Sequence, residues 1–101
     1  MYMGDMLIEL NKKNDLSINE EVEISVSSEV KDIINYKFIE GYEGVWNSIQ
    51  DYSTKQKCTW IPKNVGRYMI MVLGEKKYSS KPYSERINVV VNDKLRLIRD
   101  V

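Results

Sequence analysis

Residues 36–68 read YKFIEGYEGVWNSIQDYSTKQKCTWIPKNVGRY, and this stretch decides the fold. It divides into short runs rich in β-branched and aromatic residues, separated by glycine, asparagine and proline at positions typical of turns. We expect strands over residues 36–40, 45–49 and 56–61. Pro62 closes the last of these because proline cannot donate to a strand ladder. The stretch therefore predicts β-structure with closely spaced turns.

The sequence on either side continues the same period of two. Apolar and polar residues alternate over residues 6–10 and 22–27, as in strands with one buried face. Residues 67–73 form the strongest expected strand, and residues 86–91 form another. Strands that recur at such short intervals predict an all-β fold, an immunoglobulin- or fibronectin-III-like antiparallel β-sandwich of about seven strands.

Glycines and polar segments set the expected boundaries. Gly41 should stop the strand over residues 36–40, and Gly74 should end the strand over residues 67–73. Residues 30–34 form either one helical turn or a short loop. We expect a single sandwich domain over residues 1–92, and residues 93–101 are a C-terminal tail, a linker or an extra strand.

Size and charge exclude several classes of function. The chain has 101 residues, enough for one domain with one core. Its 15 basic and 15 acidic residues cancel, so no overall field attracts nucleic acid. No apolar run approaches the roughly 20 residues needed to cross a bilayer, and we expect no membrane insertion. The first ten residues include Asp5 and Glu9 and do not read as a signal peptide.

The inventory of reactive side chains predicts no catalytic residue, no metal site and no cofactor. The chain contains no histidine, which excludes a Ser-His-Asp triad and the usual zinc ligand sets. Cys58 is the single cysteine and lies in an expected strand. It reads as a small buried apolar residue, because a catalytic thiolate would need an imidazole or a similar partner. Calcium loops and glycine-rich phosphate loops are also missing from the sequence.

The aromatic residues are mostly tyrosine and tryptophan. Seven tyrosines and two tryptophans occur beside one phenylalanine. Trp46 and Trp60 flank expected strands, and we expect both in the core. Tyr68 follows a turn glycine, so its hydroxyl should reach a backbone group across a corner of the sandwich. Tyr52, Tyr78 and Tyr83 fall in expected loops and are candidates for contact with a partner, because tyrosine combines apolar area with a polar group.

The expected strand over residues 67–73 is apolar on both faces. Tyr68, Ile70 and Val72 point one way, whereas Met69 and Met71 point the other way with Leu73. The second face is either covered by long side chains or the termini, or it contacts a neighbouring domain or another copy. Met69 and Met71 are therefore candidate partner-binding residues, and a weak homodimer is one of the alternatives.

An ordered set of residues extends through the central stretch: Tyr36-Lys37-Phe38 leading to Gly41, then Trp46, then Cys58-Thr59-Trp60-Ile61-Pro62, then Gly66-Arg67-Tyr68. In this order and spacing, residues 36–91 resemble the triple-tyrosine domain, named for its recurring tyrosines. Trp60 occupies the place of the family's middle tyrosine, a change that preserves an aromatic core role. The resemblance implies that five aromatic residues form a structural signature: Tyr36, Phe38, Trp46, Trp60 and Tyr68.

The resemblance also sets expectations for function. Triple-tyrosine domains are immunoglobulin-like modules that follow β-propellers in two-component regulators and occur in tandem in clostridial proteins. They look like non-catalytic connectors or binding modules. The resemblance therefore implies an interaction or spacer module of a larger protein. It also implies a protein or a neighbouring domain as the partner, and it favours an extracellular or cell-surface location. A carbohydrate-binding module that stacks sugars on exposed aromatic residues is the alternative.

Overall fold

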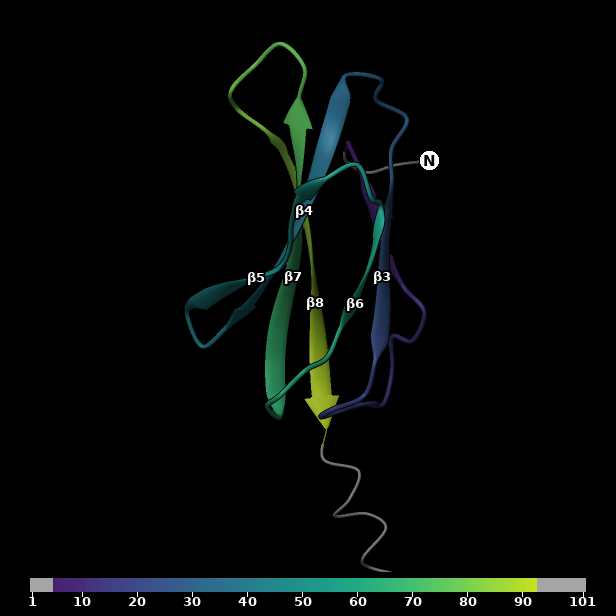
Figure 1. Ribbon diagram of the computed structural model, residues 1–101. Helices are drawn as coiled ribbons and strands as arrows, with labels where there is room; N and C mark the ends of the chain where they lie inside the picture. The colour runs from purple at the N-terminus through teal and green to yellow at the C-terminus, as the bar shows by residue number, and fades with distance from the viewer. Residues whose placement is uncertain (1–4, 93–101) are drawn as a thin grey trace, which may run out of the picture.

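The computed structural model describes residues 5–92 (Figure 1). These residues form eight strands: β1 (Leu7–Leu10), β2 (Leu16–Ser17), β3 (Val22–Ser27), β4 (Ile33–Tyr42), β5 (Val45–Ser53), β6 (Lys57–Trp60), β7 (Gly66–Lys76) and β8 (Tyr83–Asn92). The strands make two sheets, one ordered β1-β3-β6 and the other β2-β8-β7-β4-β5. The two sheets form the layers of a sandwich.

Alternation along the strands places the core between the two sheets. In β3, the apolar residues Val22, Ile24 and Val26 are buried, whereas the polar residues between them are exposed or half-buried. The same pattern recurs in β7 of the other sheet. The buried residues form one cluster: Met6, Ile8, Leu10, Leu16, Val22, Ile24, Val26, Tyr36, Phe38, Trp60, Tyr68, Ile70, Val72, Val89 and Val91. Apolar area removed from water in this cluster drives the folding of the domain.

Tyr68 closes one corner of the sandwich. Its ring is buried, and its hydroxyl accepts a hydrogen bond from the backbone N–H of Asn64 at 3.1 Å. The ring also packs against Tyr42, with ring centroids 4.6 Å apart, and the Tyr42 hydroxyl donates to the backbone carbonyl of Val65 at 2.7 Å. The expected contact of the Tyr68 hydroxyl with a backbone group is confirmed. These bonds tie the β6–β7 connection to the sheet.

The predicted all-β sandwich is confirmed, with eight strands in place of about seven. The additional strand is β2, a two-residue strand that pairs in parallel with Leu16 opposite Val91. The other pairs are antiparallel. A strand of two residues has no alternation to recognise, so only its partner β8 reveals it. The immunoglobulin-like connectivity stays a prediction.

Three expected boundaries are wrong, for one physical reason. Gly41 lies inside β4, Gly74 lies inside β7, and Ile33 and Ile34 begin β4 instead of forming a helical turn or loop. In each case a neighbouring strand continues the hydrogen-bond ladder past the residue that should have stopped it. Tertiary pairing overrides local preference here.

Residues 5–92 contain no helix long and apolar enough to cross a membrane. The expected tail, residues 93–101, lies outside the described residues. The boundary of the domain at residue 92 therefore stays a prediction.

Candidate functional site

The outer face of the five-stranded sheet carries a row of apolar side chains on β7. Met69, Met71 and Leu73 alternate with the buried residues of the strand and lie half-buried on the side away from the core. A long side chain from β8 covers part of the row, because Nη1 of Arg86 lies 3.9 Å from Sδ of Met69. No strand of the other sheet pairs or packs over this side in the described residues. The second face of β7 is thus apolar and partly open.

The register extends this row across the sheet to Trp46. Met71 pairs with Ile39, and Met69 pairs with Gly41. Gly41 in turn pairs with Trp46 on β5, so the tryptophan lies on the same outer face. Its indole lies against Gly41, where an added Cβ would come within 2.9 Å of Cζ3 of Trp46.

The expectation that Trp46 belongs to the core is wrong. Its side chain is 45 % exposed, whereas Trp60 is 2 % exposed and Tyr36, Phe38 and Tyr68 are also buried. The reason is the pairing with Gly41, which has the outward orientation of Met69 rather than the inward orientation of Phe38. Trp46 is a surface residue of the outer face.

Tyr52 lies near the end of β5 and not in a loop, as was expected. It is 39 % exposed, and Nζ of Lys37 lies 5.7 Å from the centroid of its ring. The same ammonium group lies 3.8 Å from Oδ1 of Asp51. Desolvation first, and then the carboxylates of Glu75 and Asp51, raise the pKa of the Tyr52 hydroxyl. The phenol therefore stays protonated and can donate hydrogen bonds above neutral pH.

A hollow of about 340 Å³ lies beside Trp46 at one end of the outer face. Its lining includes Trp46, Met69, Arg67 and Asn88. Tyr68 and Glu43 also line it, so the hollow combines aromatic and thioether groups with an amide and charges of both signs. Such a lining can accept an apolar group with a polar neighbour. The hollow thus extends the apolar row toward the end of β7.

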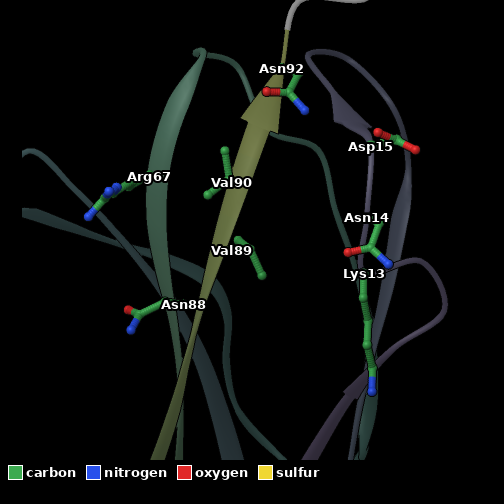
Figure 2. Close-up of a pocket in the computed structure, with 8 residues that line it drawn as sticks. All are labelled: Lys13, Asn14, Asp15, Arg67, Asn88, Val89, Val90 and Asn92. Atoms are coloured by element: carbon green, nitrogen blue, oxygen red, sulfur yellow. The ribbon is translucent and has the colours of Figure 1, made fainter.

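A larger hollow, of about 640 Å³, lies across β8 (Figure 2). Its lining comes from the segment before β2 and from β7 and β8: Lys13, Asn14, Asp15, Arg67, Asn88, Val89, Val90 and Asn92. Figure 2 shows that the side chains of Arg67 and Lys13 point in different directions. The charged groups do not converge on one point, so this hollow does not resemble a built binding site.

The other two candidate tyrosines differ in their surroundings. Tyr78 is 85 % exposed, with Nζ of Lys77 5.3 Å from its ring centroid. Tyr83 was expected in a loop, but it begins β8 and is half-buried. Its hydroxyl donates to Oδ1 of Asp32 at 3.0 Å, and desolvation together with this bond raises its pKa. Tyr78 is thus free to contact a partner, whereas Tyr83 ties the start of β8 to the loop before β4.

Cys58 lies on β6, half-buried and facing the interior. Desolvation raises the pKa of its thiol to about 11, so it carries almost no thiolate near neutral pH. Within residues 5–92, no group of three or more histidine, cysteine, aspartate or glutamate side chains is arranged to hold a metal ion. The outer face itself carries apolar side chains and charges of both signs, among them Lys37 and Glu75.

The structure therefore brings Met69, Met71 and Tyr52 onto one face, and it leaves Tyr78 in the loop before β8 and Tyr83 at the start of β8, packed against the core. Sequence reasoning missed Ile39 and Trp46 as members of that face. Ile39 could have been recognised, because it follows Phe38 directly and must point to the opposite face of the strand. Trp46 could not, because the register that pairs it with Gly41 cannot be read from the sequence.

Comparison with known proteins places the chain in a family. A family model described as the Y_Y_Y domain matches residues 27–92, more than half of the chain. The matched range includes the ordered residues from Tyr36 to Tyr68 that carry the resemblance, and it confirms that resemblance. It also spans β4, β5, β7 and β8, which form the candidate surface. A comparison with curated proteins found no match.

Proposed function

Because the chain belongs to the Y_Y_Y domain family, we propose that it is an interaction module of a larger protein and binds a protein partner or neighbouring domain through the outer face of its five-stranded sheet. Y_Y_Y domains are modules of larger proteins and are generally non-catalytic. A two-component regulator or a clostridial tandem-repeat protein is the setting that the resemblance favours.

The observation that carries the proposal is the apolar composition of this outer face. The outward side of a sandwich strand is ordinarily polar, because it faces water. On β7 and β4, however, Met69, Met71 and Ile39 occupy outward positions, and Trp46 extends the patch to β5. Clustered apolar side chains with an aromatic residue are typical of protein-binding surfaces. Met69, Met71 and Ile39 are only half-buried, and Arg86 of β8 reaches over Met69.

The ends of the described chain support a role within a larger protein. Met6 lies beside Gly74, which pairs with Tyr83 at the first residue of β8. Asn92 lies at the other end of the same strand, about 30 Å away at the usual rise per residue. The described residues thus begin near one end of the sandwich and finish at the other (Figure 1). This arrangement suits a module joined to neighbours on both sides.

Site-specific photo-cross-linking tests the proposal. A benzophenone amino acid replaces Met71 on the outer face, or Lys57 on the opposite sheet as a control, in the full gene product in its own cells. We expect a protein adduct, or an intramolecular adduct to a neighbouring domain, from position 71 and none from position 57. Equal labelling from both positions, or none from position 71, would contradict the proposal.

A second candidate function is carbohydrate binding, and one observation favours it. Trp46 and Tyr52 are both partly exposed, and both lie on β5. Six residues of strand separate them by about 20 Å, which leaves room for several sugar rings along the strand. Sugars stack on such rings through their apolar faces.

Intrinsic fluorescence distinguishes this candidate. Trp60 is buried and shielded, so acrylamide quenching reports mainly on Trp46. If soluble cell-wall polysaccharides bind the face, they should protect Trp46 from quenching, and Tyr52→Ala should reduce that protection. Quenching that every polysaccharide leaves unchanged would exclude the sugar-binding function.

A further inference from the structure

We propose that the outer face is the interface of a two-fold symmetric homodimer, in which β7 of one copy lies antiparallel across β7 of a second copy. The proposal names the partner of the interaction surface described above, and in that sense it rests on the proposed function. Its basis is the self-complementary order of side chains along β7.

The outward positions of β7 carry a cation at one end, an anion at the other end and three apolar residues between them. In chain order they are Arg67, Met69, Met71, Leu73 and Glu75. A two-fold axis that lies in the interface, perpendicular to β7 and through Met71, reverses this order in the second copy. Arg67 then lies over Glu75, Met69 over Leu73 and Met71 over Met71. Each contact occurs twice, as an isologous interface requires.

Both charged ends are available for such a pair. Arg67 is exposed and makes no ion pair within residues 5–92. Oε1 of Glu75 accepts a hydrogen bond from the Asn35 amide at 2.8 Å, which orients the carboxylate and leaves its second oxygen for a guanidinium. Arg67 and Glu75 are eight residues apart on one strand, about 26 Å, so they cannot pair within one copy.

The neighbouring strand continues the complementarity. On β4, the same rotation places Ile39 over Ile39, because Ile39 pairs with Met71 at the axis. It places Lys37 over Gly41, which is covered by the indole of Trp46. A cation above an indole is a favourable contact. The glycine thus leaves space for the indole of Trp46. In the dimer, Lys37 turns from its contacts with Asp51 and Tyr52 toward the partner's indole.

Arg86 also meets its own copy at the axis, because it pairs with Met71, and among Met71, Ile39 and Arg86 it is the one charged residue. Its guanidinium does not lie at the axis, since Nη1 turns to Sδ of Met69. Each Arg86 side chain leans toward the Arg67 end of its own β7. Because the two β7 strands are antiparallel, the two guanidinium groups point away from each other. They then cover the margins of the apolar row.

The size of the face sets the strength of the dimer. Four strands at the usual spacing and nine residues at the usual rise give a face of about 20 Å by 30 Å, or roughly 600 Å² per copy. Stable interfaces bury about 800 Å² per partner. Packed twisted sheets also cross at about 30°, so contact is closest near Met71 and the long side chain of Arg67 spans the wider gap at the end. A weak, reversible dimer is the expected state.

Sedimentation velocity over a concentration series of the chain tests the dimer and its orientation. We expect a concentration-dependent increase in sedimentation coefficient for the wild type. Met71→Lys should weaken association about tenfold or more, because it buries a charge at the axis. Arg67→Glu and Glu75→Arg should each weaken it in the same way through like-charge contacts, while the Arg67→Glu/Glu75→Arg double variant restores it. Lys57→Glu, on the opposite sheet, is the matched control and should sediment like the wild type.

Mixing gives the sharpest readout. An equimolar mixture of Arg67→Glu and Glu75→Arg copies should form a heterodimer, because each reversed charge then meets its opposite. A monomeric wild type at every concentration, or a dimer that the charge variants leave unchanged, overturns the proposal. In either case an adduct to another protein from position 71 would leave the interaction function intact, so the two failures are distinguishable. Circular dichroism spectra confirm that each variant is folded.

Discussion

The indole Nε1 of Trp60 donates a hydrogen bond to Oε1 of Glu40 at 2.6 Å and so joins β6 of one sheet to β4 of the other. Trp60 is the largest fully buried side chain, and its ring meets the ring of Tyr68 edge-on with centroids 5.1 Å apart. A buried indole N–H needs an acceptor, because leaving it unpaired costs the full desolvation of the group. The Glu40 carboxylate supplies that acceptor across the two layers.

Glu40→Ala should lower the free energy of unfolding by about 1–3 kcal/mol, because it leaves the Trp60 N–H without its partner. Glu40→Gln keeps an oxygen acceptor and should lower it by less. Urea unfolding followed by tryptophan fluorescence measures both changes. Glu9→Ala, at an exposed position of β1, is the control and should change stability little. Equal losses for the alanine and glutamine variants would show that the acceptor oxygen is unimportant.

Tyr68→Phe should lower the free energy of unfolding by about 0.5–1.5 kcal/mol, because the Asn64 N–H loses its acceptor while the ring packing stays. Urea unfolding monitored by circular dichroism gives the value. Tyr78→Phe removes the hydroxyl of a tyrosine that is 85 % exposed, and it should leave stability unchanged. A stability of Tyr68→Phe equal to that of the wild type would mean that water replaces the hydroxyl at this corner.

Gly66→Ala should lower the free energy of unfolding by about 1–3 kcal/mol, because Gly66 has a φ of 131°, a conformation that side chains other than hydrogen disfavour. An added Cβ would meet only ordinary contacts, the nearest being Tyr42 at 3.4 Å, so the loss reports backbone strain and not a clash. Thermal and urea unfolding of the variant measure the loss. An unchanged midpoint in both would contradict this account.

Gly41→Ala should leave stability nearly unchanged but displace the indole of Trp46. The new Cβ would come within 2.9 Å of a ring that is partly exposed and can move outward. Acrylamide should therefore quench tryptophan fluorescence more strongly in the variant than in the wild type. Trp46→Phe provides the control, since the remaining signal then comes from buried Trp60. The same quenching in Gly41→Ala and in wild type would place the indole elsewhere.

Cys58 should react slowly with iodoacetamide in the folded protein. Its pKa of about 11 leaves about one thiol in a thousand ionised at pH 8, far below an ordinary cysteine. The pKa is raised in the folded state only, so the thiol's contribution to stability is present below its ordinary pKa and declines as pH rises toward 11. Mass spectrometry of alkylation at pH 8 measures the rate, with the protein in guanidinium chloride as the fast-reacting reference. Fast alkylation of the folded protein would contradict the burial of the thiol.

The sequence by itself determined seven of the eight strands, though not all of their boundaries, and it determined which side of most strands is buried. Apolar and polar residues alternate along a strand with a period of two, which is a local property of the sequence. Val22, Ile24 and Val26 can therefore be assigned to one face without knowledge of the partner strand. The ordered aromatic residues likewise indicated the family before any comparison. Local pattern was sufficient for both because neither depends on register.

Only the tertiary structure decided where the candidate surface lies. Trp46 reaches the outer face because β5 aligns it with Gly41, and the bulges between Tyr36 and Ile39 set that alignment. A shift of one residue in the β4–β5 register would have turned Trp46 inward, into the core position that was expected from the sequence. Gly74, likewise, stays within β7 because it pairs with Tyr36 and Tyr83 on either side, and Met6 and Ile33 pack where its side chain would be. Strand register and close packing are long-range properties of the folded chain, and they place the exposed aromatic and apolar residues on one face.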